Sequence, residues 1–239
     1  MHTLAIDIGN TQAKLGLFLN NKLIHIYTFS TLEPKLLDEI LERFNIKSAI
    51  LSNVGSNNTY KSYLLNKINL LCLNQNTPVP FANLYQTPQT LGVDRMALTA
   101  AAVTMFKNQN TLVIDCGTCV TYDFVDEENN YYGGAISPGL MMRLKAMNEF
   151  TAKLPLVTFT QPGSFIGQNT GDCMLSGAFF GLINEIDGFI NQYLAIYSNL
   201  QVVITGGDGS VLAKHLKNNI FAHENFLLHG LNSILEYNV

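Results

Sequence analysis

Two short segments of the chain each place an aspartate, a glycine and a hydroxyl residue directly after an apolar stretch. They are Leu4–Thr11 (LAIDIGNT) and Leu112–Cys119 (LVIDCGTC). An aspartate at the end of a strand can hold hydrated Mg²⁺, because this ion takes few carboxylates and keeps several of its waters. A glycine in the turn lets the following backbone amides approach a phosphate. The two segments therefore indicate two candidate phosphate-binding turns.

The first turn is read as a donor set for a transferring phosphoryl group. The hydroxyl of Thr11 and the ammonium of Lys14 add to the backbone amides of Asn10 and Thr11. A strand rather than a helix follows, so this is neither a Walker A loop nor a dinucleotide fingerprint. Alone, these residues favour an ordinary hairpin turn. The repeat at Asp115, 108 residues after Asp7, reverses that preference, because two such hairpins can clamp one polyphosphate between two lobes.

Three further motifs have competing interpretations. In Gly92–Arg95, Asp94 opens an Ala-rich helix (Met96–Phe106), where it serves either as a catalytic carboxylate or simply to suit the helix dipole. In Thr205–Gly209 (TGGDG), the glycines permit close approach of a ligand to the backbone, or Asp208 is an ordinary N-cap. The Cys-x-x-Cys of Cys116–Cys119 is interpreted as a coincidence, because it lies in a predicted hairpin and has no second Cys pair.

The elements that must position these residues occur twice. Each half opens with a three-strand meander, continues with a helix and adds a later short strand. The expected strands are Lys14–Leu19, Lys22–Phe29, Ser48–Leu51, Val120–Val125, Tyr131–Ile136 and Val202–Thr205, and the expected helices are Pro34–Phe44 and Leu140–Phe150. The polar stretch near Phe106–Asn110 predicts the junction, giving an N-terminal lobe (1–107) and a C-terminal lobe (108–239).

Composition excludes several other classes. The 239 residues are 47% hydrophobic and only 13% charged, with a net charge of −4 and no run of Lys or Arg, so nucleic acid is not an expected ligand. The N-terminus lacks a signal peptide, and Glu185 and Asp187 interrupt the most apolar stretch, so no membrane span is expected. Four cysteines do not make a disulfide scaffold, and the chain is predicted to be cytoplasmic. The low charge also hints at surface buried against a second copy.

Taken together, the motifs resemble a known family. Paired Asp-x-Gly hairpins resemble the actin, hexokinase and Hsp70 ATPase superfamily, and the whole chain resembles the type III pantothenate kinases. The matching segments follow in family order: Asp7–Gly16, Gly92–Arg95, Asp115–Thr121, Gly133–Gly139, Leu154–Pro155, Gly167–Gly177 around Thr170, and Thr205–Asp208. Cys119, Cys173 and Met147 depart from the usual residues without removing a polar group. The resemblance implies a two-lobe actin-like (ribonuclease H-like) α/β fold with duplicated mixed-sheet lobes and flanking helices.

The resemblance also implies an activity and a residue set. The activity is ATP-dependent phosphorylation of pantothenate, the first step of coenzyme A biosynthesis, with Asp94 as general base. Asp115 would hold a monovalent cation, K⁺ or NH₄⁺, and Asp7 would hold Mg²⁺ through water. The implied phosphate contacts are Asp7, Ile8, Gly9, Asn10, Thr11, Gln12, Ala13, Lys14 and Thr118, and the implied substrate contacts are Tyr85, Gly92, Val93, Asp94, Arg95 and Thr170.

Other interpretations remain open on the sequence. The resemblance implies a homodimer with the pantothenate pocket near the subunit interface. A kinase of the same superfamily acting on another small molecule is one alternative. A transcription accessory factor on the same fold is the other, although the intact Asp7, Asp94 and Asp115 argue against a regulator without catalysis.

Overall fold

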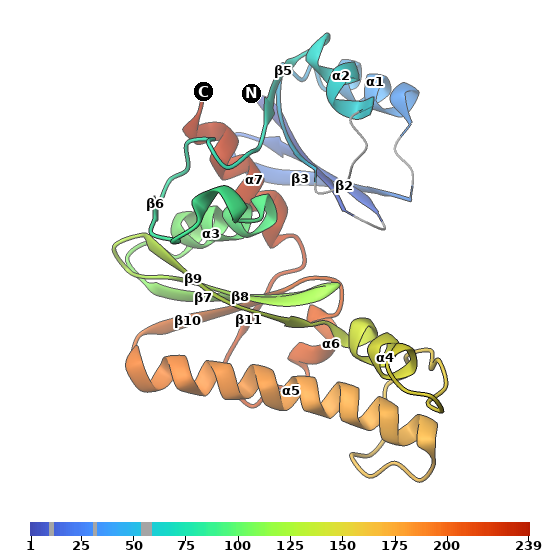
Figure 1. Ribbon diagram of the computed structural model, residues 1–239. Coiled ribbons are helices and arrows are strands. Elements are labelled where there is room, and N and C mark those ends of the chain that lie inside the picture. Colours follow the sequence, from blue (N-terminus) through green and yellow to red (C-terminus); the bar gives the residue numbers. More distant parts are fainter. Residues whose placement is uncertain (10–11, 31–32, 54–58) are drawn as a thin grey trace. The chain divides into compact units, whose positions relative to one another are not determined.

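A computed structural model describes residues 1–9, 12–30, 33–53 and 59–239, which form two compact α/β units (Figure 1). The first unit contains Met1–Asn108, Glu128–Tyr132 and Asn225–Val239, and the second contains Gln109–Glu127 and Gly133–Glu224. The division near residue 108 lies where the polar junction was expected. The structure departs from the expected lobes of 1–107 and 108–239 in two segments. Glu128–Tyr132 and Asn225–Val239 belong to the first unit rather than to the second.

The first unit is built on a five-stranded sheet with the order β3-β2-β1-β4-β5. The strands are β1 (His2–Ile8), β2 (Ala13–Leu19), β3 (Lys22–Phe29), β4 (Ser48–Asn53) and β5 (Asn69–Cys72). The first three form an antiparallel meander, whereas β4 runs parallel to β1 and β5 parallel to β4. Asn20 and Asn21 both adopt positive φ between β2 and β3, as a tight hairpin turn requires.

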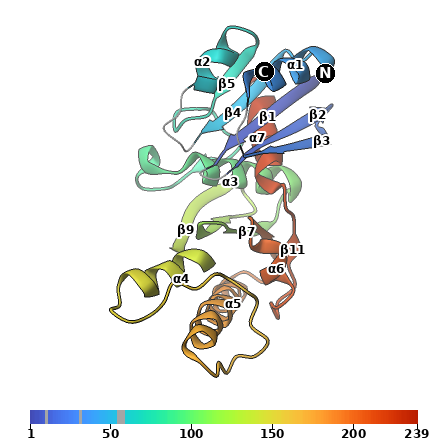
Figure 2. The same ribbon diagram turned by 90° about the vertical axis from the view of Figure 1, so that its right-hand side faces the viewer.

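Helices cover both faces of this sheet (Figure 2). Along β1, Leu4 and Ile6 face a core shared with α1 (Pro34–Arg43) and α2 (Thr59–Leu65). Side chains alternate along a strand, so Thr3 points to the other face, where its hydroxyl donates to Asn232 of α7 (Phe226–Tyr237). The helix α3 (Val93–Met105) packs closely against α7.

A glycine makes this helix pairing close. A Cβ on Gly230 of α7 would overlap the carbonyl of Ala97 in α3, so only glycine allows the two backbones to approach this far. Before α3, the chain forms the short strand β6 (Ala82–Asn83) and one 3₁₀ turn, η1 (Pro88–Thr90).

The second sheet has the order β11-β10-β7-β8-β9-β6. Its strands are β7 (Asn110–Cys116), β8 (Cys119–Val125), β9 (Asn130–Pro138), β10 (Leu200–Thr205) and β11 (Phe221–Ala222), and β6 pairs with the first residues of β9. As in the first unit, the opening strand β7 is antiparallel to the next strand and parallel to the later strand β10. The accompanying helices are α4 (Leu140–Glu149), α5 (Thr170–Ile196) and α6 (Gly209–Ala213).

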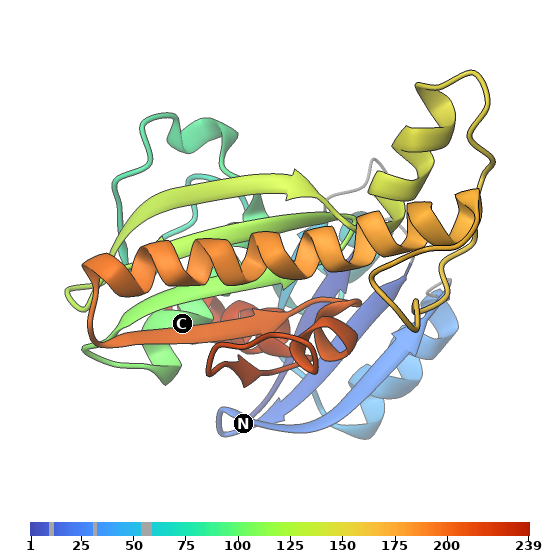
Figure 3. The same ribbon diagram turned by 90° about the horizontal axis from the view of Figure 1, so that it is seen from below.

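The long helix α5 lies across one face of the second sheet (Figure 3). Alternate residues of β8, including Tyr122 and Phe124, share a core with Phe179 and Ile186 of α5. Among the described residues, α5 is the one helix with the length and apolar composition of a membrane span, and 56% of its most apolar window is buried. Its apolar character is therefore accounted for by packing in the second unit. The predicted duplicated meanders and the predicted strands and helices are confirmed, with ends that move by at most three residues.

Candidate active site

Asp7 occupies the centre of a small polar group in the first unit. Its position in β1 is paired with Lys14 of β2 on one side and with Ser52 of β4 on the other, so the three side chains share one face of the sheet. Burial raises the pKa of Asp7 to about 6, and the negative charge of Asp94 adds to the rise, against the opposing effects of Ser52 and Lys14. The charged form of Asp7 is thus disfavoured, and a cation beside it would restore that form.

Ser52 is a polar residue of this group that sequence reasoning missed. It is fully buried, and its Oγ has no hydrogen-bond partner among the described residues, although it lies close enough to Asp7 to lower the pKa of that carboxyl. A buried hydroxyl without a partner is uncommon. Ser52 could have been found from the parallel pairing of β1 with β4. The carboxyl ends of parallel strands meet at one edge of a sheet, so a residue near the end of β4 is expected beside Asp7 near the end of β1.

Asp94 and Arg95 lie in the first turn of α3, as predicted. The backbone N–H of Arg95 donates to Asp94 Oδ1 at 2.8 Å, and Asp94 is half-buried. Arg95 is 6% exposed, and its guanidinium carbon lies 5.7 Å from the ring centre of Tyr85. The structure therefore brings together Asp7 with Asp94, and Arg95 with Tyr85. Gly92 is the N-cap residue of α3, and Val93 is the first residue of the helix.

The remaining residues of the first turn are placed only in part. Asn10 and Thr11 lie outside the described residues. Ile8 ends β1, Gln12 is exposed, and Ala13 opens β2 with a buried side chain. The N–H of Gly9 donates to the carbonyl of Gln12 at 3.0 Å, which closes the turn.

Gly9 was expected to let the backbone turn sharply, but neither Gly9 nor its counterpart Gly117 has a positive φ. Among the described residues, a Cβ on Gly9 would meet the Gln12 carbonyl at 3.4 Å, and one on Gly117 would meet the Cys119 carbonyl at 3.7 Å. Backbone strain therefore does not explain these glycines.

In the second unit, two other glycines enclose the Asp115 turn. Gly206 has a φ of +90°, and a Cβ there would overlap Asp115 Oδ1 and the backbone of Cys116. A Cβ on Gly139 would overlap the carbonyls of Gly117 and Thr118. Backbone hydrogen bonds join the same segments. The Asp208 N–H donates to the Cys116 carbonyl at 3.0 Å, and the Gly139 N–H donates to the Thr118 carbonyl at 3.1 Å.

The side chains of this second turn differ in exposure. Asp115 is half-buried, whereas Thr118 is exposed at the tip of the hairpin. Asp208 precedes α6 without making a side-chain cap, and burial raises the pKa of its carboxyl. The N-cap interpretation of Asp208 is therefore correct in position but not in hydrogen bonding.

The Cys-x-x-Cys pair has the properties of packing residues. Cys116 is fully buried, and burial, followed by the charge of Asp115, raises the pKa of its thiol far above the usual range. This disfavours the thiolate that redox exchange needs. Within the described ranges, no three His, Cys, Asp or Glu side chains are grouped as a metal cage.

Thr170 is the first residue of α5 in the second unit, and it is exposed. On the sequence alone, Thr170 could instead be the N-cap of a helix that starts near Gly171, and this alternative is wrong. Asn169 is the N-cap, and its side-chain oxygen accepts from the N–H of Asp172 at 2.9 Å. Thr170 is thus not needed as the cap.

Each unit thus opens with a meander and adds a strand parallel to its first strand. In each unit the Asp-x-Gly motif lies where the first strand enters the hairpin turn. This combination defines the actin-like ATPase fold. A ROK family glucokinase from Streptomyces griseus, solved with glucose and AMPPNP, shares the fold with a TM-score of 0.50 at 10% identity over 99% of both chains. A protein from Campylobacter jejuni, assigned to the Baf family of transcriptional activators, gives a TM-score of 0.61 at 26% identity over 98% of both chains. The predicted fold class is confirmed.

Sequence comparison identifies the family. The family model for type III pantothenate kinase matches residues 3–192. A type III pantothenate kinase from Flavobacterium johnsoniae is 44% identical over 99% of this chain and 98% of its own length. One from Bacteroides fragilis is 42% identical over 98% of both. The chain belongs to the type III pantothenate kinase family.

Proposed function

We propose that this protein transfers the γ-phosphoryl group of ATP to the primary hydroxyl of pantothenate, the first step of coenzyme A biosynthesis. Family membership along nearly the whole chain supports this activity. The observation that carries the proposal is the proximity of two carboxylates within the first unit, where the charge of Asp94 acts on the partly buried Asp7. One carboxylate is then available for a proton and the other for the metal of the nucleotide.

Asp94 is the general base of this proposal. Its hydrogen bond from the Arg95 N–H fixes one carboxylate oxygen, and its half-buried position leaves the group accessible to a substrate hydroxyl. A carboxylate within hydrogen-bond reach orients that hydroxyl and accepts its proton as the phosphoryl group transfers.

Arg95 binds the carboxylate of pantothenate, because a guanidinium fork matches a carboxylate in two parallel hydrogen bonds. The ring of Tyr85 beneath the guanidinium helps to hold its plane. Gly92, Val93 and Thr170 complete the proposed substrate contacts.

The phosphates and cations are assigned to the two turns. Asp7, the Ile8–Ala13 segment, Lys14 and Thr118 bind the phosphates. Asp7 suits Mg²⁺, since a cation offsets the burial that raises its pKa to about 6. Mg²⁺ supplies charge neutralisation on the transferring group. K⁺ or NH₄⁺ is assigned to Asp115, whose half-buried carboxylate lies near the end of strand β7, where the second turn begins.

The transfer is direct. A loose phosphoryl transition state needs positioning and charge stabilisation rather than a covalent intermediate. The chain's own contributions are therefore the base Asp94 and the anion contacts around Asp7, Lys14 and Arg95.

The test is ADP release that depends on pantothenate, measured with and without K⁺. We expect turnover with pantothenate and stimulation by K⁺. A panel of sugars and hydroxy acids runs in parallel, and turnover on one of these without turnover on pantothenate would assign the protein to another small-molecule kinase. ATP binding without turnover on any acceptor would favour regulation.

Regulation is the second candidate function because the Campylobacter jejuni protein of similar fold is assigned to transcriptional activators. The kinase proposal has stronger support, since the curated relatives at 35–44% identity are type III pantothenate kinases.

We also propose a cytoplasmic homodimer that binds neither nucleic acid nor membrane. Exposed apolar side chains in the second unit support a contact with a second copy, notably Phe150, Leu156, Phe165 and Ile166. Light scattering at micromolar concentration tests this, and a monomer would contradict it.

A further inference from the structure

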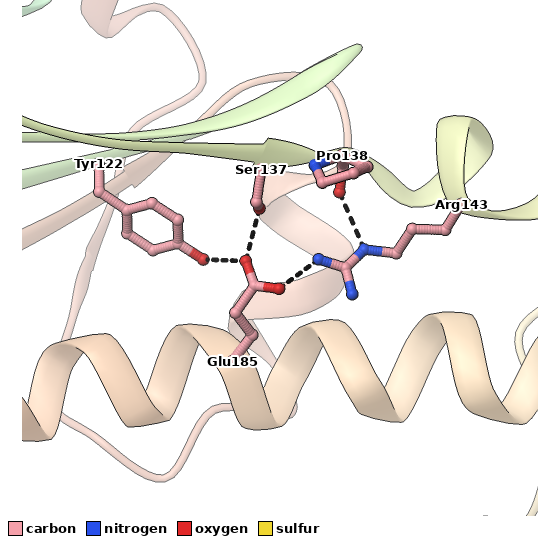
Figure 4. Close-up of polar contacts among 5 residues, drawn as sticks. All are labelled: Tyr122, Ser137, Pro138, Arg143 and Glu185. Atoms are coloured by element: carbon pink, nitrogen blue, oxygen red, sulfur yellow. Dashed lines mark hydrogen bonds and ion pairs between the residues drawn. The ribbon is translucent and has the colours of Figure 1, made fainter. Parts of the chain in front are cut away.

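A polar cluster in the second unit joins four elements through one carboxylate (Figure 4). Glu185, in the middle of α5, accepts hydrogen bonds on Oε1 from Tyr122 of β8 at 2.9 Å and from Ser137 of β9. Its Oε2 pairs with Arg143 of α4. The Arg143 Nε–H also donates to the carbonyl of Pro138 at 2.9 Å, so Arg143 contacts both the carboxylate and the backbone beside it.

The surroundings of Glu185 favour its charged form. Burial opposes the charge, but the hydrogen bonds from Ser137, Arg143 and Tyr122 outweigh it and lower the pKa of Glu185 below its usual range. The side chains of Glu185 and Arg143 are 25% and 21% exposed, so solvent screens the pair only in part. A charge held by three donors from three different elements restrains all of them.

The cluster reaches the candidate site through three consecutive residues. Ser137 and Pro138 are held by Glu185 and Arg143, and Gly139 follows them. Gly139 N–H donates to the Thr118 carbonyl at 3.1 Å, and its Cα packs so closely on the Gly117 and Thr118 carbonyls that a Cβ would overlap them. The position of the Asp115–Thr118 turn therefore depends on where segment 137–139 is held.

We propose that Glu185 is a positioning residue that holds segment 137–139 against the Asp115–Thr118 turn and thereby sets the affinity for the ATP phosphates. This inference rests on the proposed function, in which that turn contacts ATP. Glu185 itself touches neither substrate; it acts through Ser137, Arg143 and Gly139.

Replacing Glu185 by Gln tests this with almost no change in volume. The amide keeps one acceptor oxygen for Tyr122 and Ser137, but its NH₂ group now faces the Arg143 guanidinium, so two donors oppose each other. The matched control is Glu127→Gln, the same change on an exposed residue of the second unit just after β8.

We expect Glu185→Gln to raise the KM for ATP about tenfold while the KM for pantothenate stays within twofold of wild type. A carboxylate that only stabilises the fold would lower the melting temperature and the fraction of active enzyme, which reduces kcat and leaves both KM values unchanged. Unchanged KM values for ATP would therefore overturn the proposal, whatever happens to stability.

The partner residue gives a second readout. Arg143→Gln removes the donor to the Pro138 carbonyl, so it should raise the KM for ATP as well. If both residues act through segment 137–139, the double variant should be little worse than either single one, because the effects are not additive within one network. Additive effects on the KM for ATP would contradict the shared route.

Failure of the proposed function has a different appearance. It shows in the wild-type protein as an absence of pantothenate-dependent ADP release. Failure of the Glu185 proposal shows as normal wild-type turnover with an unchanged KM for ATP in the variant.

Discussion

The two Asp-x-Gly hairpins place different residues opposite their carboxylates. In the first, four residues separate the last paired positions, Ile8 and Ala13, and Lys14 stands opposite Asp7. In the second, three residues separate Cys116 and Val120, and Thr121 stands opposite Asp115. Lys14 places a cation opposite the carboxylate of the first hairpin, whereas the hydroxyl opposite Asp115 donates to Asp123 Oδ2 at 3.0 Å. The repeat therefore keeps the turn but changes the type of residue opposite the carboxylate.

The two turns also differ in what surrounds them. Among the described residues, a Cβ on Gly9 would meet one backbone oxygen, that of Gln12. The Asp115 turn is enclosed by Gly139 and Gly206, both of which contact its backbone. The second turn therefore takes its shape from neighbouring loops, whereas no such close glycine contact is found at the described part of the first.

The largest effect is expected from Asp94→Asn, which tests whether the phosphoryl transfer takes place in the region around Asp7. Loss of the base should reduce kcat about 10³-fold, in the range for general-base residues, while the melting temperature stays close to wild type. Pantothenate-dependent ADP release gives the measurement. Asp38→Asn is the control, since Asp38 is a surface carboxylate of the same unit, paired with Lys67. Undiminished turnover in Asp94→Asn would exclude Asp94 as the base.

The second-largest effect is expected at the two hairpin carboxylates, Asp7 and Asp115, which can be compared directly. Asp7→Asn should lower kcat/KM for ATP about 100-fold, as removal of a preorganised charge contact does. Asp115→Asn should act mainly by weakening K⁺ binding. Its loss of kcat/KM for ATP should be smaller, and added K⁺ should partly restore the activity. Steady-state kinetics over a K⁺ titration separates the two. Equal losses with equal K⁺ dependence would remove the distinction between the hairpins.

The same Asp7 variant should be more stable than wild type at neutral pH. The folded-state pKa of about 6 lies above the ordinary value of 3.8, so the folded protein keeps the Asp7 proton longer as pH rises. Stability is therefore lost between about pH 4 and pH 6, by at most about 3 kcal/mol. Melting temperatures should show a gain for Asp7→Asn at pH 7 that disappears at pH 4. A gain independent of pH would contradict this origin.

A smaller effect separates the surroundings of the two turns. Gly206→Ala should lower the melting temperature by several degrees, because the new Cβ overlaps Asp115 and a φ of +90° strains an alanine. Gly9→Ala should leave the melting temperature unchanged and raise the KM for ATP severalfold. Thermal unfolding and kinetics on both variants provide the test, and destabilisation by Gly9→Ala would show that this turn is sterically constrained after all.

The smallest effect is expected at the Cys-x-x-Cys pair. Cys119→Ala should change turnover by less than twofold, and reductant should not change it further, because the buried Cys116 thiol resists ionisation. Activity with and without dithiothreitol is the measurement. A reductant-dependent activity would give the pair a redox role.

Local patterns predicted the elements because burial on one face of a strand leaves a period of two in the sequence. Asn20-Asn21 marked its hairpin, and Asp94 was placed in the first turn of α3, since such signals involve only neighbours in the chain. The sequence did not reveal that α7 joins the first unit. That choice depends on contacts across more than 100 residues, such as Thr3 with Asn232.

Polar roles within the site were harder to predict for the same reason. Ser52 lies beside Asp7 because of the register between β1 and β4. The N-cap of α5 is Asn169 rather than Thr170, which follows it. Glu185 and Asp187 were noticed only as interruptions of an apolar stretch. Their partners come from distant elements: Ser137 and Arg143 for Glu185, and the N–H of Lys217 for Asp187.

The return of α7 to the first unit has a consequence for synthesis on the ribosome. The first unit lacks one of the helices on its sheet until residues 226–237 have been made, after the entire second unit. The half of the protein that is translated first is thus completed last. During that interval the face of β1 and β4 that α7 covers stays open to other chains.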